Sequence, residues 1–182
     1  MLFWPVGDLM RLPVVILFFL ASMAFSQQQD GGTNLPPAKF PSQVSSVDGK
    51  IVDVAQLAKK NKLVIVTLKA TWCEVCQEQL YRIKKKLYES KACGLTYLVL
   101  APGPKEELKT IQKATGFPFP FIEDKDLRIA ESLGLRMSKE EIFPSIFVLN
   151  GDLTIGWMQA GRGEGAYGDP DLFEALQCAE WI

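Results

Sequence analysis

Two cysteines separated by two residues constrain this chain more than any other feature. They lie in the run Trp-Cys-Glu-Val-Cys at 72–76. The apolar run 63–68 precedes them and has the unbroken hydrophobicity of a strand that is buried on both faces of a sheet. The stretch 77–88 that follows has helical character. Cys73 and Cys76 are therefore predicted at the junction of a buried strand and a helix N-terminus, a position that suits thiol–disulfide exchange.

The position of Cys73 predicts a reactive thiolate. The helix dipole and the unpaired backbone N–H groups at a helix N-terminus favour an anion, so the thiolate is expected to form nearer neutral pH. Cys76 lies three residues further on, within reach to close a disulfide or to resolve a mixed one.

Size and charge exclude several other classes of protein. The 182 residues are enough for one ordinary domain with extensions. A net charge of -1 gives no indication of a nucleic-acid or anionic-membrane partner. The chain contains no histidine, which excludes a histidine general base, a histidine metal ligand and a Cys–His dyad.

The N-terminus has the pattern of a secretory signal. Arg11 precedes the apolar run 12–20, and Ala-Phe-Ser at 24–26 fits a small-x-small cleavage site. We interpret residues 1–26 as a cleaved signal peptide and expect a secreted or other extracytoplasmic protein, in a periplasm or a secretory pathway. The alternative is a membrane anchor retained at 12–25, although a span needs about 20 apolar residues. Disulfides persist outside the cytosol, so the cysteine pair can rest oxidised there.

The rest of the chain divides into a flexible leader at 27–41, rich in Gln, Gly and Pro, and one domain at 42–182. Strands are predicted at 44–47, 50–52, 63–70, 95–100, 145–149 and 153–158, with a short extended piece at 117–123. Helices are predicted at 53–60, 77–88, 105–115, 126–133 and 171–181, and a glycine-rich loop at 161–168. This alternation predicts an α/β fold with a central mixed sheet flanked by helices.

The order of elements and the cysteine motif resemble the thioredoxin superfamily from about residue 44 onward. Four features carry the resemblance: the motif at 72–76, the segment 117–135 with Asp124, Phe-Pro-Ser at 143–145, and Asn-Gly-Asp at 150–152. The chain is most similar to exported redoxin-like domains of the AhpC/TSA type, which carry an insertion before the last hairpin. The resemblance implies a thioredoxin-like fold with that insertion.

The resemblance also implies a substrate-binding region. In the family, the proline that opens the late strand is cis and faces the cysteine pair, and Pro144 stands at that position. Phe143 would then have its backbone free to pair with an extended substrate chain. Trp72 is either a substrate platform or a residue packed beside the motif.

The chain departs from the thioredoxin pattern around the cysteines. Glu74 and Val75 replace the usual Gly-Pro pair, and Thr67 replaces a buried aspartate that helps to move the proton of the second cysteine. That proton would pass to water or to another carboxylate such as Glu78. Two charged residues are candidates for tuning the pKa of Cys73: Lys69 would lower it if its ammonium lies near the thiolate, and Glu74 would raise it. The alternative for Lys69 is a side chain that simply reaches solvent.

We therefore expect an exported thiol–disulfide oxidoreductase that uses Cys73 and Cys76, with the direction of electron transfer left open. Its expected partners are protein thiols and disulfides or an upstream thiol reductant, and no cofactor or metal is expected beyond the redox-active disulfide. One alternative is a peroxiredoxin-like antioxidant, but Ala70 and Val66 stand where the peroxidatic motif has Thr and Pro. The others are a binding or chaperone-like module without turnover and, more weakly, a Cu(I) carrier.

The two other cysteines permit two interpretations. Cys93 precedes a predicted strand and Cys178 lies in the predicted last helix. They are either two buried small hydrophobic residues or a structural disulfide of an exported domain.

Overall fold

The computed structural model describes residues 38–161 together with Leu172, Glu174 and Leu176. The chain divides into two units, Met1–Pro36 and Pro37–Ile182, and the described residues all belong to the second. The predicted signal peptide, most of the leader, most of the glycine-rich loop and most of the terminal helix lie outside the described residues. Within the described residues, no helix is both long enough and apolar enough to cross a membrane.

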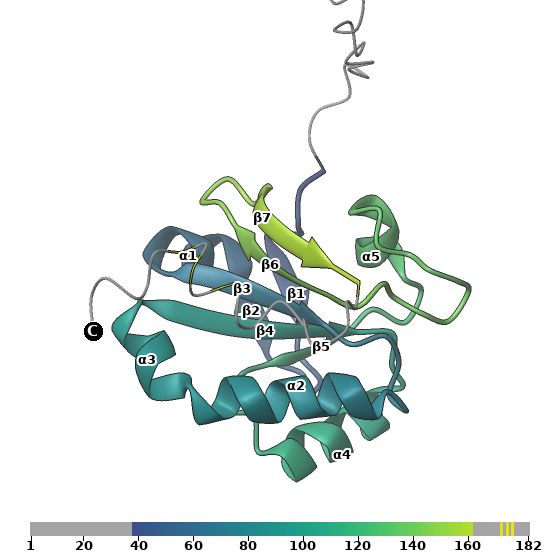
Figure 1. The fold of residues 1–182 in the computed structure, drawn as a ribbon. Helices are drawn as coiled ribbons and strands as arrows, with labels where there is room; N and C mark the ends of the chain where they lie inside the picture. The colour runs from purple at the N-terminus through teal and green to yellow at the C-terminus, as the bar shows by residue number, and fades with distance from the viewer. Residues whose placement is uncertain (1–37, 162–171, 173, 175, 177–182) are drawn as a thin grey trace, which may run out of the picture. The chain divides into compact units, whose positions relative to one another are not determined.

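A five-stranded mixed sheet forms the centre of the described domain, in the order β5-β4-β3-β6-β7 (Figure 1). The strands are β3 (Lys62–Thr67), β4 (Leu95–Ala101), β5 (Phe121–Glu123), β6 (Ser145–Leu149) and β7 (Ile155–Ala160). The strands β3, β4 and β5 run parallel, whereas β6 pairs antiparallel with both β3 and β7. The predicted mixed α/β fold is confirmed.

Helices cover both faces of this sheet, as Figure 1 shows. One face carries α2 (Glu74–Lys85), α3 (Leu87–Ala92) and α4 (Lys105–Thr115), and the other carries α1 (Val54–Lys60) and α5 (Arg128–Ser132). Alternate side chains of β3 enter different cores: Val64 and Val66 pack with α2 and α4, while Leu63 and Ile65 pack with α1 and α5. This two-sided burial explains the unbroken apolar run of β3.

The N-terminal hairpin forms where the sequence predicts it. It consists of β1 (Gln43–Ser45) and β2 (Ile51–Asp53), and Gly49 takes the positive φ of 81° that its turn needs. Asp53 caps α1 by accepting a hydrogen bond from the N–H of Gln56 at 2.8 Å. Just before this hairpin, Phe40 is buried in the core and its N–H donates to the carbonyl of Leu153.

Several element boundaries differ from the prediction for local reasons. The helix after the motif begins at Glu74 instead of residue 77, because Cys73 itself caps it, and it ends at Lys85 before the separate helix α3. The last strand begins at Ile155 instead of residue 153. Leu153 has a positive φ of 72°, and the N–H of Asn150 bonds to the carbonyl of Thr154, which extends the turn.

The predicted insertion is present between α4 and β6 and contains β5 and α5. The carboxylate of Asp124 is buried and accepts hydrogen bonds from the backbone N–H groups of Ile129 and Ala130 at 3.2 and 2.8 Å. These bonds satisfy donors at the start of a five-residue helix that has little stability of its own.

Replacement of Asp124 by alanine is expected to lower the free energy of unfolding by about 2–3 kcal/mol, because a buried N–H group and a part-buried one both lose a charged acceptor. Urea denaturation followed by circular dichroism measures this loss. Asp124→Asn keeps one side-chain oxygen as an acceptor and should lose less. Equal stability of Asp124→Ala and the wild type would show that the carboxylate does not hold this insertion.

Candidate active site

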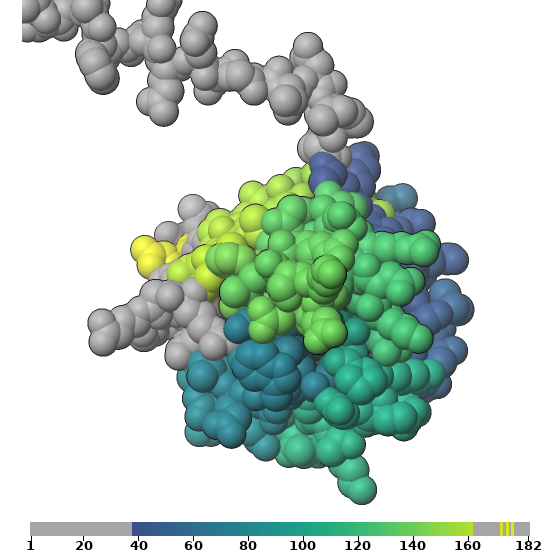
Figure 2. All heavy atoms as spheres, turned by 90° about the vertical axis from the view of Figure 1, so that its right-hand side faces the viewer, coloured from purple at the N-terminus to yellow at the C-terminus, as the bar shows by residue number. Residues whose placement is uncertain are grey.

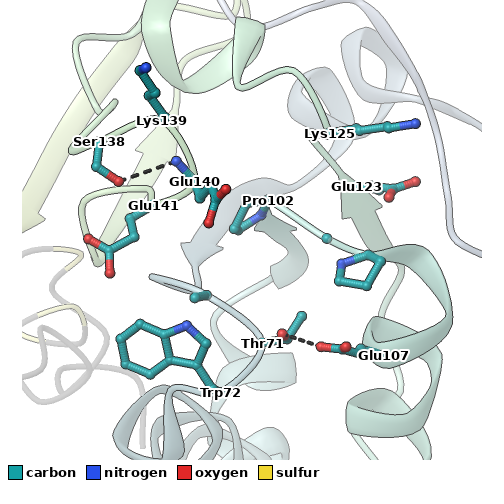
Figure 3. A pocket seen from close by; sticks show the side chains of 13 residues that line it. Thr71, Trp72, Pro102, Glu107, Glu123, Lys125, Ser138, Lys139, Glu140 and Glu141 are labelled. Carbon is teal, nitrogen blue, oxygen red and sulfur yellow. Dashed lines mark hydrogen bonds between the residues drawn. The ribbon is translucent and has the colours of Figure 1, made fainter.

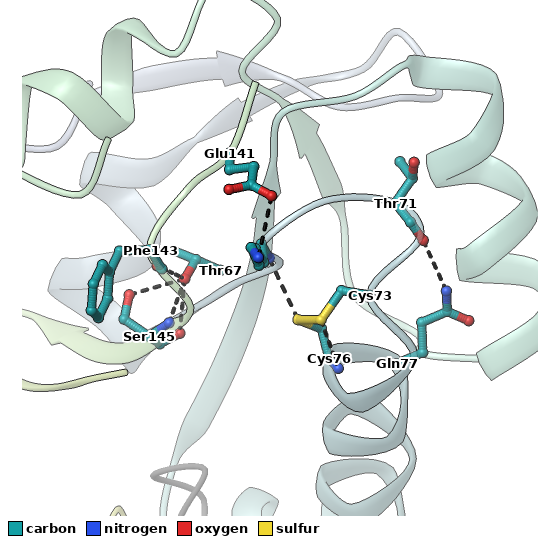
Figure 4. Close-up of a disulfide and its surroundings, with 9 residues drawn as sticks. Thr67, Thr71, Cys73, Cys76, Gln77, Glu141, Phe143 and Ser145 are labelled. Carbon is teal, nitrogen blue, oxygen red and sulfur yellow. Dashed lines mark hydrogen bonds and ion pairs between the residues drawn. A yellow bond between two sulfur atoms is a disulfide. The ribbon is translucent and has the colours of Figure 1, made fainter. Parts of the chain in front are cut away.

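Cys73 and Cys76 form a disulfide at the N-terminus of α2 (Figure 4). Their Cα atoms are 5.3 Å apart, and both residues are only 3% exposed. Cys73 is the N-cap residue, and its Sγ accepts a hydrogen bond from the N–H of Cys76 at 3.3 Å. The Sγ of Cys76 accepts one from the N–H of Lys69 at 3.5 Å. Each sulfur thus faces a backbone donor that favours a thiolate when the disulfide is reduced.

The turn before the helix is held by hydrogen bonds to its own backbone. The N–H of Cys73 donates to the carbonyl of Ala70 at 3.2 Å, and the carbonyl of Cys73 accepts from the N–H of Gln77 at 3.2 Å. The side-chain amide of Gln77 also donates to the carbonyl of Thr71 at 3.0 Å. Sequence reasoning did not single out Gln77, although a polar residue one helical turn after an N-cap is a recognisable signal.

Lys69 forms an ion pair that the sequence did not predict. Its ammonium lies 3.2 Å from a carboxylate oxygen of Glu141 and 4.8 Å from the centroid of the Trp72 ring. The Lys69 and Glu141 side chains are 23% and 24% exposed, so the ammonium is held in a half-buried ion pair and does not extend freely into solvent. Glu141 is 72 positions away in sequence and gives no sequence signal. The N–H of Ile142 bonds to the carbonyl of Lys69 and brings the two segments together.

The other predicted residues on the cysteine side are at the surface. Trp72 is 64% exposed, so its ring is not packed into the core beside the motif. Glu74 is exposed in the first turn of α2, where a carboxylate also stabilises the helix. Glu78, the predicted alternative proton acceptor, is exposed on the same helix.

The prediction of a cis peptide bond at Pro144 is wrong. Among the described residues, the cis bond precedes Pro104 instead. The backbone of Phe143 is also not free, because its N–H donates to the carbonyl of Leu135 at 2.7 Å and its carbonyl accepts from the Thr67 hydroxyl at 2.8 Å. These bonds fix the segment in its place without a cis bond. The ring of Phe143 is 39% exposed, so it remains the part of this residue that a substrate can contact.

Thr67, which stands where thioredoxins carry a buried aspartate, has a structural role. It is fully buried at the end of β3, and its hydroxyl also accepts a hydrogen bond from the N–H of Ser145 at 2.6 Å (Figure 4). Its side chain therefore joins the end of β3 to the start of β6, on either side of Pro144. The sequence showed only that a carboxylate was missing.

A hollow of about 850 Å³ opens beside Trp72 (Figure 3). Its walls come from the turn before the cysteines, the turn at 102–104 with Glu107, the end of β5, and the loop 138–141. The Thr71 hydroxyl donates a hydrogen bond to Glu107 and joins two of these walls. In the space-filling view of Figure 2, the green surface around residues 130–144 lies directly above the blue-teal surface of the cysteine turn.

The described residues contain no group of three or more His, Cys, Asp or Glu side chains that could hold a metal ion. The central mixed sheet, the flanking helices and the cysteine pair at a helix N-terminus define a redoxin domain of the thioredoxin superfamily.

Comparison with known proteins specifies the family. The sequence profile described as "AhpC/TSA family" matches residues 32–158, which is most of the chain. The chain therefore belongs to the AhpC/TSA family, whose members carry out thiol-based redox chemistry. A curated relative, peroxiredoxin-like 2C of Takifugu rubripes, is 28% identical over 98 residues. That match covers 52% of this chain and 42% of the relative, so the chain spans less than half the length of that protein.

Solved structures of peroxiredoxins have the same fold. Peroxidoxin BcpB of Mycobacterium tuberculosis has a TM-score of 0.65 at 12% identity, and the match covers 81% of this chain and 99% of that one. Peroxiredoxin Q of Xanthomonas campestris has a TM-score of 0.65 at 19% identity, covering 79% and 94%. The reduced 2-Cys peroxiredoxin of Plasmodium vivax has a TM-score of 0.61 at 13% identity, covering 79% and 97%. At these identities the likeness concerns the fold alone.

Proposed function

We propose that the chain is a thiol–disulfide oxidoreductase that exchanges electrons with protein thiols through Cys73 and Cys76. One observation carries the proposal. Cys73 is the N-cap of α2, is joined to Cys76 in a disulfide, and receives a backbone N–H bond at its sulfur. A dithiol in this position combines a stabilised thiolate with a resolving thiol one helical turn away.

The proposed reaction transfers two electrons. In the reduced protein, the thiolate of Cys73 attacks one sulfur of a substrate disulfide, forms a mixed disulfide and releases the first substrate thiolate. The thiolate of Cys76 then attacks the Sγ of Cys73, releases the second substrate thiolate and forms the Cys73–Cys76 disulfide. Protons from solvent neutralise the released thiolates. In the opposite direction the oxidised pair accepts two electrons from a substrate dithiol by the same steps reversed.

Substrate binding is proposed on the exposed side of the cysteine turn. Trp72 offers an exposed ring beside Cys73, and Phe143 offers a second ring next to Pro144. The hollow beside Trp72 leaves room for a segment of a partner protein. Both cysteines are nearly buried, so the side chains that cover them must move before a substrate can reach their sulfur atoms.

Peroxide reduction is the second candidate, and the family membership favours it. In that reaction the thiolate of Cys73 attacks one oxygen of a peroxide, the other oxygen leaves as an alcohol or water, and Cys76 condenses with the resulting sulfenic acid to give the disulfide and water. The residues argue against fast turnover, because Ala70 supplies no hydroxyl where the peroxidatic motif has Thr, and Val66 replaces the Pro of that motif.

A direct competition between oxidants separates the two functions. The purified protein, reduced and freed of reductant, is mixed with a small protein disulfide or with hydrogen peroxide, and loss of its thiols is followed over time. Our proposal predicts faster oxidation by the protein disulfide, with release of two substrate thiols per molecule. Faster oxidation by peroxide, with one peroxide consumed per disulfide formed, would favour the peroxidase.

Export and the use of the disulfide without any further cofactor remain part of the proposal. The apolar run 12–20 and the small residues at 24–26 support a signal peptide, with an anchor at 12–25 as the alternative. Edman or mass-spectrometric analysis of the N-terminus after expression in a secreting host tests this: a new N-terminus near residue 27 supports export, and an intact N-terminus contradicts cleavage.

A further inference from the structure

A half-buried ion pair lies beside the cysteine turn and includes Lys69, a residue that also contacts this turn through its backbone. The ammonium of Lys69 pairs with Glu141 at 3.2 Å. The backbone N–H of Lys69 bonds to the sulfur of Cys76, and its ammonium lies over the ring of Trp72, the residue before Cys73. The charges of Lys69 and Glu141 thus lie at the cysteine turn itself, in surroundings that screen them less than solvent does.

The remaining charged groups near the turn are mostly carboxylates. Glu74 and Glu78 lie on α2, Glu107 on α4 is bonded to Thr71, and Glu140 precedes Glu141 in the loop. Among the charged residues that line the hollow, Glu123 at the end of β5 bonds to the N–H of Lys105, and the exposed side chains of Lys125 and Lys139 supply the cations. Lys69 is therefore the cation that the described contacts tie to the cysteine turn, and Glu141 is the group that balances it.

We propose that Lys69 and Glu141 are positioning residues that set the redox poise of the Cys73–Cys76 couple. Lys69 stabilises the reduced form, which carries a thiolate. Glu141 holds the Lys69 ammonium over Trp72 and offsets its charge. This inference rests on the proposed function, because it concerns the same couple. The reaction measured is the reduction of the disulfide by two molecules of glutathione, which yields the dithiol and one glutathione disulfide.

The two ends of the pair are expected to shift this equilibrium in opposite directions. In Glu141→Gln no carboxylate offsets the positive charge of Lys69, so this charge stabilises the thiolate more strongly. The equilibrium therefore moves toward the reduced protein by about threefold to tenfold. In Lys69→Met no ammonium offsets the negative charge of Glu141, so this charge disfavours the thiolate. The equilibrium therefore moves toward the disulfide by a similar factor. A tenfold change corresponds to about 30 mV for a two-electron couple. The double variant should return close to the wild type, and Lys69→Arg should stay close to it.

A matched control is the ion pair that joins α5 to the segment between α5 and β6. Glu131 pairs with Arg136 at 3.0 Å on the exposed surface. Glu131→Gln removes the same charge and also breaks an ion pair made by this segment, at a pair that has no described contact with the cysteine turn. We expect its glutathione equilibrium to stay within about twofold of the wild type, because exposed charges are strongly screened.

The opposite signs separate the proposal from a purely structural role. If the ion pair only anchored the loop, Glu141→Gln and Lys69→Met would loosen the same contact and shift the equilibrium in the same direction. Shifts of the same sign, or shifts no larger than that of Glu131→Gln, would overturn the inference while leaving the proposed function in place. A wild-type protein with no reversible couple would overturn the proposed function, and the inference with it.

Discussion

Replacement of Cys73 by serine is expected to reduce disulfide exchange by about a thousandfold or more, because a serine hydroxyl is not ionised near neutral pH and cannot form a disulfide. Replacement of Cys76 by serine should have a different effect. The first attack still occurs, but no thiol resolves the mixed disulfide. Cys76→Ser should therefore accumulate a covalent complex with its substrate, visible as a reductant-sensitive band on a non-reducing gel.

Cys93→Ser supplies the matched control, because it replaces a cysteine at the C-terminal end of α3, away from the cysteine turn. It is expected to keep the exchange rate of the wild type and to form no trapped complex. The assignment of roles fails if Cys73→Ser, and not Cys76→Ser, traps the substrate, since Cys76 would then be the attacking group. Equal activity of the wild type and both variants would contradict the site as a whole.

Replacement of Thr67 by valine is expected to lower the free energy of unfolding by about 2–4 kcal/mol. Valine fills nearly the same space, but it leaves the N–H of Ser145 without its acceptor and the carbonyl of Phe143 without its donor, both at the buried end of β3. Chemical denaturation followed by tryptophan fluorescence measures this change.

Thr67→Ser keeps the hydroxyl and loses only a methyl group, so it should recover most of the stability. The comparison of the two variants separates hydrogen bonding from packing. If Thr67→Val were as stable as Thr67→Ser, the hydroxyl would not be what joins β3 to the Pro144 segment.

Sequence reasoning succeeded where the signal is local. The burial of β3 was predicted from its apolar run, and the N-terminal cap of α1 was predicted from Asp53. The end of α4 was predicted from Gly116, which takes a positive φ of 60°. The place of the cysteines also followed from residues next to them in the chain. In each case the residues that determine the structure are within a few positions of one another.

The prediction failed where distant segments meet. The cis bond expected at Pro144 came from the family resemblance, whereas the actual conformation depends on Thr67 and Leu135 bonding to Phe143 across the fold. The ion-pair partner of Lys69 could not be predicted from the sequence either. Several carboxylates were possible partners, and only the position of the loop before β6 shows that the partner is Glu141.

Family membership and the local cysteine motif favour different functions. The family favours peroxide chemistry, whereas the cysteine motif favours dithiol exchange, and both functions would use the same two sulfur atoms.

A redox titration of the Cys73–Cys76 pair against glutathione tests the central claim most directly. The purified protein is equilibrated in buffers of graded glutathione ratio, and the dithiol fraction is measured after thiol alkylation. We expect one reversible two-electron transition that is absent in Cys73→Ser. Its reduction potential should lie between about -270 mV, the value for a thioredoxin-like reductant, and about -120 mV, the value for a strong oxidant. A pair that stays in one state across the whole range would contradict an oxidoreductase and would favour a binding module.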